Sequence, residues 1–190
     1  MLDKRLMSPE RRKLLGAFAG IATVAAAPVY SGVFGFLKGA GDIRQLKMQA
    51  QRSGEQINIV YWIDGKYVKP ALQEISNLMR DWRNDEVMNM DVNNIDNIAA
   101  VQNLLETNEP FMLLSGYRTP ATNRMLASKS RRVAKDSYHT KGMAADLRLQ
   151  SRSMTKVAAA AQAVAGGGVG RYYRSNFTHI DCGPIRTWRS

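Results

Sequence analysis

The chain has 190 residues, 45% of them hydrophobic, and a formal net charge of +11 at neutral pH. This length suits a single domain with its own hydrophobic core, and the single cysteine excludes a small scaffold held together by internal disulfides. The excess of positive charge favours an anionic partner. Nucleic acid is not the expected one, because the basic residues are dispersed and the sequence has no nucleic-acid-binding motif.

Residues 1–27 have the features of an export signal. A basic stretch ends in Arg11, Arg12 and Lys13, and the apolar stretch that follows, from Leu14 to Ala27, is shorter than a membrane span requires. The arginine pair close before this stretch is typical of a twin-arginine signal, so we expect the twin-arginine export machinery as a partner and a periplasmic location. The cleavage site stays open because Pro28 follows the small residues. An uncleaved leader would anchor the protein to the inner membrane.

After the leader, residues 28–54 are rich in Gly, Ser and Gln and are interpreted as a linker. The domain is expected to span residues 55–190. It begins with a predicted strand at Ile57 to Ile63, a tight Asp-Gly turn and a second short strand over residues 66–68.

Two amphipathic helices are predicted next. The first helix begins at Pro70, and the second spans residues 95–107. In both, apolar residues recur at spacings of three and four. A buried strand is then predicted over Phe111 to Leu114, with Arg118 at its C-terminal end. A helix starts near Pro120, and residues 123–132 are expected to form a basic exposed loop.

The last third of the chain alternates between strands and a helix. Strands are predicted over residues 144–149, 169–173 and 177–181, and an alanine-rich helix over residues 154–164. The whole pattern indicates an α+β fold, in which helices cover a small, mainly antiparallel sheet.

The two histidines of the chain, His139 and His179, and the carboxylate of Asp146 form a candidate metal site. Two imidazoles and one carboxylate leave the fourth tetrahedral position of Zn²⁺ open for water, as in catalytic zinc sites. Side chains two residues apart on a strand share a face, so Asp181 is expected beside His179. The alternative is that both histidines are ordinary core or surface groups.

The motifs around these residues resemble a known group. Ser137, His139, Gly142, Ala144 and Asp146 follow a Ser-x-His-x-x-Gly-x-Ala-x-Asp pattern that resembles the first zinc motif of the D-Ala-D-Ala carboxypeptidase, lysostaphin and hedgehog-like fold group. Residues 115–120 resemble the substrate-arginine motif of the same group. More specific agreement, with the twin-arginine-exported murein endopeptidases of the murein endopeptidase K type, is found in residues 167–173, 176–181 and 186–188.

The resemblance implies a zinc endopeptidase that cuts peptide cross-links of peptidoglycan, for which a bond between diaminopimelate residues is one candidate. It implies that Arg118 contacts a substrate carboxylate or carbonyl, and Ser137 is a further candidate for substrate contact. Related peptidases carry a base shortly before the second zinc histidine, but Asn176, Phe177 and Thr178 stand there. Asp181 is therefore the candidate base, or alternatively a group that orients an imidazole.

Two other functions stay open at this point. One is a carboxypeptidase that trims D-amino acids from stem peptides. The other is a zinc-containing module that binds the cell wall without cutting it, because the usual base is missing.

Overall fold

The computed structural model describes residues 43–190. The predicted export signal and residues 28–42 of the predicted linker lie outside this range. Among the described residues, no helix is both long enough and apolar enough to cross a membrane.

One sheet of eight strands runs through the described part of the chain, in the order β3-β2-β1-β4-β5-β7-β6-β8. The strands are β1 (Ile43–Ala50), β2 (Gln56–Ile63), β3 (Lys66–Tyr67), β4 (Phe111–Ser115), β5 (Ala144–Arg148), β6 (Gly168–Tyr172), β7 (Phe177–Asp181) and β8 (Arg186–Arg189). The helices are α3 (Lys69–Leu78), α4 (Val92–Leu104), α5 (Pro120–Lys129), α6 (Met154–Val164) and the short 3-10 helix η2 (Tyr138–Lys141).

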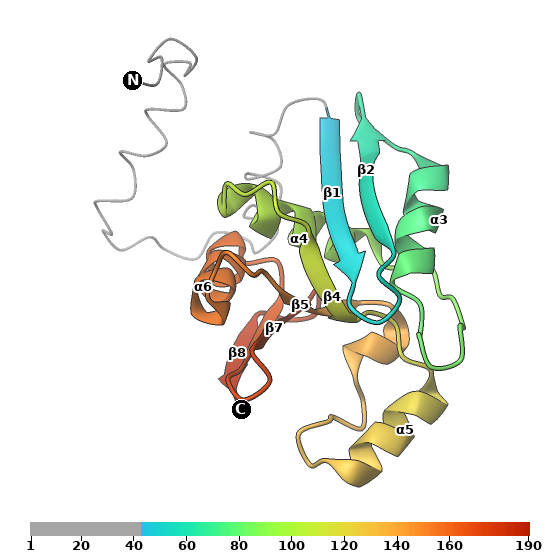
Figure 1. Cartoon of the computed structure of the whole chain (residues 1–190), viewed down its shortest axis with the longest axis vertical. Helices are drawn as coiled ribbons and strands as arrows, with labels where there is room; N and C mark the ends of the chain where they lie inside the picture. Colours follow the sequence, from blue (N-terminus) through green and yellow to red (C-terminus); the bar gives the residue numbers. More distant parts are fainter. Residues whose placement is uncertain (1–42) are drawn as a thin grey trace.

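The pairing of the strands confirms the predicted fold class. β4, β5, β7 and β6 form a central antiparallel block, and β1 pairs antiparallel with β2. Only β1 with β4 and β6 with β8 pair in parallel within the described residues. Helices α3, α4 and α6 pack against this mainly antiparallel sheet, as Figure 1 shows.

The predicted linker is wrong in its second half, because residues 43–50 form β1 near the middle of the sheet. Leu46 and Met48 of this strand are fully buried. A third inward-facing position holds Arg44, whose guanidinium binds Asp96 of α4 at 2.9 Å and stacks on the Trp62 ring. A charged residue at an inward position interrupts the alternation of apolar and polar residues by which a strand is recognised in a sequence.

Two further element predictions need correction. The expected basic loop over residues 123–132 is mostly helix, because α5 continues to Lys129. This helix buries only Thr122 and Asn123, so it lacks the apolar stripe by which a helix is recognised in a sequence. Strand β8 was not predicted at all. The hairpin of β2 and β3, helices α3, α4 and α6, and strands β4 to β7 lie within a few residues of their predicted positions.

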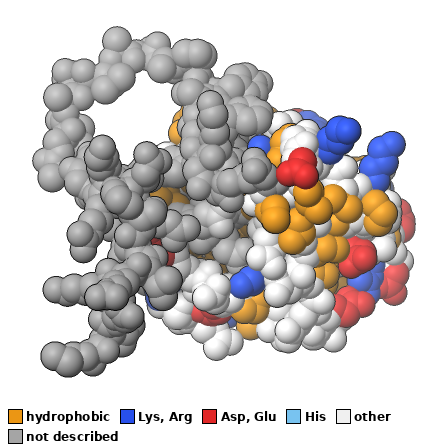
Figure 2. All heavy atoms as spheres, turned by 90° about the horizontal axis from the view of Figure 1, so that it is seen from above, with side chains coloured by type: hydrophobic (Ala, Val, Ile, Leu, Met, Phe, Trp, Pro, Cys, Tyr) orange, Lys and Arg blue, Asp and Glu red, His pale blue; other side chains and the backbone are white. Residues whose placement is uncertain are grey.

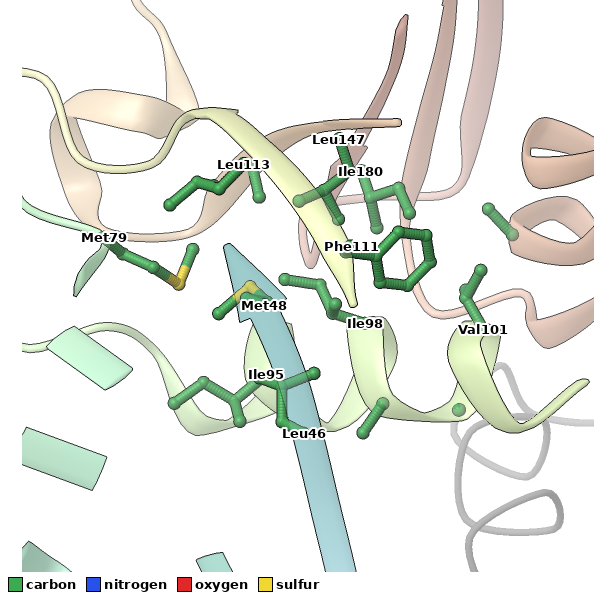
Figure 3. Close-up of a cluster of buried hydrophobic side chains, with 14 of the residues drawn as sticks. Leu46, Met48, Met79, Ile95, Ile98, Val101, Phe111, Leu113, Leu147 and Ile180 are labelled. Carbon is green, nitrogen blue, oxygen red and sulfur yellow. The ribbon is translucent and has the colours of Figure 1, made fainter. Parts of the chain in front are cut away.

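The main core lies between the sheet and the helices. Phe111, Leu147 and Ile180, from three neighbouring strands, approach Ile98 and Val101 of α4 (Figure 3). Each of these side chains is at least nine-tenths buried. Burial of an aliphatic or aromatic side chain of this size stabilises the fold by about 1.5–3 kcal/mol.

The alternation of side chains along β5 and β7 separates core from site. Leu147 and Ile180 enter the core, whereas their neighbours Asp146 and His179 face the opposite side of the sheet. The core therefore fixes the two strands that carry two of the predicted metal ligands.

Charged side chains of both signs are interspersed on the uncovered part of the face shown in Figure 2. Acidic and basic groups lie around a group of hydrophobic side chains there, and neither sign forms a continuous patch. The positive net charge is therefore not gathered on this part of the surface.

Asp81 fixes the loop that follows β4. Its carboxylate is fully buried and accepts hydrogen bonds from the backbone N–H and the hydroxyl of Thr119, at 2.9 and 3.1 Å, and from the N–H of Arg83. Burial alone would raise the pKa of Asp81, but these hydrogen bonds and one from Thr122 outweigh it and lower the pKa. Thr119 caps α5 and directly follows Arg118, so Asp81 holds Arg118 in place.

Asp81→Asn should lower the free energy of unfolding by about 2 kcal/mol, because hydrogen bonds to a buried charged acceptor are lost. The pKa of Asp81 is lower in the folded protein, so the charged group stabilises fully above its unfolded value of about 3.9. That contribution declines as the pH falls from there toward the folded pKa. Urea unfolding should therefore show a constant difference between pH 5 and 8, and a smaller one at about pH 3.

The matched control is Asp85→Asn, because Asp85 is exposed and has a positive φ that asparagine tolerates. We expect a change within about 0.5 kcal/mol. Equal losses for the two variants would show that Asp81 has no special role in stability.

Candidate metal centre

His139 is positioned by a short helix with defined ends. The hydroxyl of Ser137 accepts the N–H of His139 at the start of η2, and Gly142 ends it with a φ of 68°. At that φ a side chain is strained, and a Cβ on Gly142 would lie within 3.0 Å of the carbonyl oxygen of Asn89. This turn leads directly into β5, so His139 and Asp146 approach each other from consecutive elements.

His179 reaches the same point from the neighbouring strand. β5 and β7 pair antiparallel, and Asp146 and His179 are directly opposite in the register. Their side chains project from the same face of the sheet at adjacent positions. All three residues are buried, with 2–7% of their surface exposed.

The three side chains converge on one point through one atom each. Nε2 of His139 lies 3.2 Å from Oδ1 of Asp146 and 3.2 Å from Nδ1 of His179, and the last two atoms are 2.9 Å apart. Ligands about 2.0–2.1 Å from a tetrahedral zinc ion would be separated by roughly 3.3 Å. The ligand triangle in the structure therefore fits a tetrahedral ion with only small adjustments.

Hydrogen bonds on the far side of each imidazole fix its tautomer. Nδ1 of His139 lies 2.6 Å from the carbonyl oxygen of Gly116, which can only accept, so Nδ1 carries the proton and Nε2 keeps its lone pair. Nε2 of His179 donates to Oδ2 of Asp181 at 2.9 Å, which leaves the lone pair of Nδ1 facing Asp146. Both lone pairs thus point to the same place. This is what a metal ion requires of neutral histidine ligands.

The electrostatics of the site favour a neutral His139 and a charged Asp146. Burial, and then the positive charge of Arg118, lower the pKa of His139 to about 4. Burial opposes the ionisation of Asp146, but its neighbours His139, Arg118 and His179 hold its pKa well below the usual value. His139 is therefore neutral and Asp146 charged at neutral pH, as metal ligands must be.

Arg118 adjoins the cluster from the loop after β4. Its Nε donates to the hydroxyl of Ser115 at 2.8 Å, and its Nη2 forms a short ion pair with Oδ2 of Asp146. The two oxygens of Asp146 therefore have separate partners: Oδ1 faces the histidines and Oδ2 faces Arg118. Within residues 43–190, Nη1 of Arg118 makes no hydrogen bond.

A pocket of about 530 Å³ opens above the cluster. Arg118, His139, Asp146 and His179 line it from below. One wall is aromatic, because the rings of Tyr172 and Phe177 stack with centroids 4.5 Å apart, and Trp188 lies 5.2 Å from the His179 ring. Such a pocket can hold an extended polar chain against an apolar wall and over the cluster.

The predicted site residues take different places. His139, Asp146 and His179 come together, and Arg118 lies beside them. Ser137 lines the pocket, but its hydroxyl is engaged by the N–H of His139.

Asp181 shares a face with His179, as the i, i+2 spacing predicted, and lies on the side of that imidazole away from the ligand triangle. Thr178, one of the positions at which the resemblance led us to expect a base, points into the core and donates to the carbonyl of Met154. It is unavailable for acid–base chemistry.

Several residues of the site escaped prediction. The carbonyl of Gly116 supports His139, and the pocket wall includes Tyr172 and Trp188. Every residue has a backbone carbonyl, so the sequence does not indicate which one contacts a histidine. The aromatic pair could have been predicted, because Tyr172 ends one predicted strand and Phe177 begins the next. In an antiparallel hairpin these two positions are directly opposite each other.

A mixed sheet that carries a buried His-Asp-His cluster beneath an open pocket is the arrangement expected of a metal-dependent hydrolase. Residues 38–188 match the family model of the M15 peptidases described as Peptidoglycan L,D-endopeptidase MepK. The chain therefore belongs to this peptidase family. The membership confirms the resemblance to the murein endopeptidases and the expectation of an enzyme rather than a binding module.

Curated relatives agree with the family match over nearly the whole chain. The chain is 38% identical over 178 residues to the Peptidoglycan L,D-endopeptidase MepK of Escherichia coli K12, a match that covers 94% of this chain and 96% of the relative. The protein of the same name from Shigella flexneri matches equally. The probable peptidoglycan L,D-endopeptidase MepK of Haemophilus influenzae is 37% identical over 147 residues, which cover 77% of this chain and 79% of the relative.

Gly116→Ala tests whether the carbonyl behind His139 supports metal binding. A Cβ at this position would lie within 3.0 Å of three atoms of Met79, including its carbonyl oxygen, which backbone pairing with Tyr117 holds in place. We expect a loss of about 1–3 kcal/mol in unfolding free energy and weaker metal binding, measured by competition with a chromogenic chelator.

Gly54→Ala is the control, because a Cβ at Gly54 would meet open space and the positive φ of this residue adds only local backbone strain. It should cost about 1 kcal/mol from backbone strain and leave metal affinity unchanged. Unchanged metal affinity in Gly116→Ala would show that the Gly116 carbonyl does not support metal binding.

Proposed function

We propose that this chain is a zinc-dependent endopeptidase that hydrolyses L,D peptide bonds in the cross-links of peptidoglycan. The observation that carries the proposal is the convergence of two imidazole lone pairs and one carboxylate oxygen at the floor of a pocket. Nitrogen and carboxylate ligands in this number suit zinc with one position left open, and a bound zinc ion would lower the pKa of its water and polarise a carbonyl. The names of the relatives supply the substrate class.

The residues around the ligand triangle have separate roles in this proposal. Arg118 orients Asp146 through Nη2, and its unengaged Nη1 donates to a carbonyl or carboxylate of the substrate. The aromatic wall of Tyr172, Phe177 and Trp188 packs against the apolar part of the bound peptide and excludes water from that side. Ser137 contributes to the site by holding η2 rather than by direct chemistry.

Of the two roles considered for Asp181, the contacts favour orientation over proton transfer. Its carboxylate is fully buried and does not line the pocket. Of the two ring nitrogens of His179, the carboxylate contacts only Nε2, which faces away from the ligand triangle. A base must come within hydrogen-bond reach of the reacting group, directly or through one water. Asp181 therefore holds the tautomer and the ring orientation of His179.

The location follows from the substrate. Peptidoglycan lies outside the cytoplasm, and the features of residues 1–27 are those of a twin-arginine export signal. We propose that the protein works in the periplasm after passage through the twin-arginine machinery. If the leader is retained, that segment tethers the domain to the inner membrane.

Digestion of purified sacculi tests the function directly. Metal-loaded protein should release new muropeptides whose masses correspond to cut cross-links, and treatment with a chelator should abolish the release until zinc is restored. His139→Ala should reduce the rate by more than about 100-fold, because removal of a ligand is more severe than removal of its supporting group.

The products separate the alternatives. Release of single D-amino acids without loss of cross-links would mean a carboxypeptidase. Sacculi that bind the protein but keep their muropeptide profile would mean a wall-binding module.

Arg118→Lys should lower kcat/KM by about 10–100-fold, because lysine keeps the charge but loses the planar fork that serves Ser115, Asp146 and the substrate together. The matched control is Arg131→Lys, an exposed residue outside the pocket, which should behave as wild type. Wild-type kinetics for Arg118→Lys on soluble cross-linked muropeptides would remove this arginine from substrate recognition.

A further inference from the structure

We propose that Arg186, on the C-terminal strand β8, is a positioning residue for the metal ligand His179 and acts through Asp181. The inference rests on the proposed function only in taking the His-Asp-His cluster as a metal site. It assigns a role to the last strand of the chain.

Asp181 needs a cationic partner because of where it lies. The carboxylate is fully buried, and removing a charge from water costs several kcal/mol unless it is compensated. Arg186 supplies that compensation with a fork, in which Nη2 contacts Oδ2 at 2.7 Å and Nη1 contacts Oδ1 at 3.0 Å. The N–H groups of Gly168 and Gly183 also donate to Oδ1, at 3.1 and 2.9 Å.

These contacts fix the direction of the carboxylate. Oδ1 accepts three donors, so the carboxylate cannot rotate without breaking several hydrogen bonds. Oδ2 is thereby aimed at Nε2 of His179, whose opposite nitrogen belongs to the ligand triangle. The path from Arg186 to the metal position thus consists of two side chains in direct contact.

Arg186 is itself held by aromatic rings. Its guanidinium carbon lies 5.0 Å from the centroid of Tyr138 and 4.9 Å from that of Trp188. Trp188 donates from Nε1 to the hydroxyl of Tyr172 at 3.2 Å. The guanidinium therefore keeps one orientation, since cation–π contacts on two sides add to the fork.

Three glycines leave the space that these side chains occupy. A Cβ would lie within 3.0 Å of Arg186 and Asp181 at Gly168, of the Trp188 ring at Gly170, and of the Tyr138 ring at Gly183. Glycine at each position lets the backbone approach the side chains around Arg186 closely. The packing around Arg186 is therefore part of the fold rather than an accident of a surface side chain.

The alternative role for Arg186 is direct contact with substrate, because its side chain is 40% exposed and lines the pocket. The two roles predict different measurements. A positioning residue changes the affinity for metal in the absence of substrate. A substrate contact changes KM and leaves metal affinity alone.

The test is the zinc dissociation constant of the full chain, measured by competition with a chromogenic chelator without peptidoglycan present. Asp181→Asn should weaken zinc binding by about 10–100-fold, and Arg186→Gln by about 10-fold. Arg186→Lys should fall between Arg186→Gln and wild type, since it restores the charge without the fork. The double variant should resemble Asp181→Asn alone, because Arg186 acts through Asp181.

Arg189→Gln is the matched control, as it changes an exposed arginine on the same strand and should keep wild-type zinc affinity. Circular dichroism verifies that each variant is folded. If Arg186→Gln does not fold, the zinc affinity of Arg186→Lys alone decides the test. Unchanged zinc affinity in Arg186→Lys and Arg186→Gln, or additive losses in the double variant, would overturn the inference. A wild-type chain that binds zinc but leaves sacculi uncut would refute the proposed function and leave this inference intact.

Discussion

The site depends on the hydrogen bond that each histidine makes on its far side. Gly116 accepts from Nδ1 of His139, and Asp181 accepts from Nε2 of His179, so opposite ring nitrogens of the two residues are left to face Asp146. Neither acceptor touches the ligand triangle. If either imidazole adopted the other tautomer, an N–H would point at the place where a cation must sit. The supporting contacts are therefore as much a part of the proposed metal site as the three proposed ligands.

The sheet order explains why the contacts that support the two histidines come from parts of the chain that are far apart in sequence. β5 carries Asp146 between β4, which leads to the Gly116 carbonyl and Arg118, and β7, which carries His179. The His139 side is held by the early part of the domain, where Asp81 fixes the loop after β4. The His179 side is held by β8, the last strand. The cluster therefore depends on contacts from two parts of the domain that are far apart in sequence.

Local sequence patterns were sufficient for the cluster of His139, Asp146 and His179 and insufficient for the contacts that support it. The cluster and the neighbouring Asp181 were predictable because a motif and a two-residue alternation each act over a few positions. The contact between Asp81 and Thr119 joins residues 38 positions apart, and no local pattern encodes it. Elements were missed for similar reasons. The buried charge of Arg44 is stabilised by Asp96, 52 positions later, and interrupts the apolar alternation of β1.

The distribution of charge in the site favours an electrophilic centre. Asp146, the one anionic ligand, is paired with Arg118, and Asp181 is paired with Arg186, so the two carboxylates near the cluster are each balanced by a guanidinium. The remaining ligands are neutral imidazoles. A divalent ion in this place would keep most of its positive charge, which the protein alone does not neutralise. That charge is then available to the carbonyl oxygen that becomes negative during amide hydrolysis, in a pocket whose aromatic wall limits screening by water.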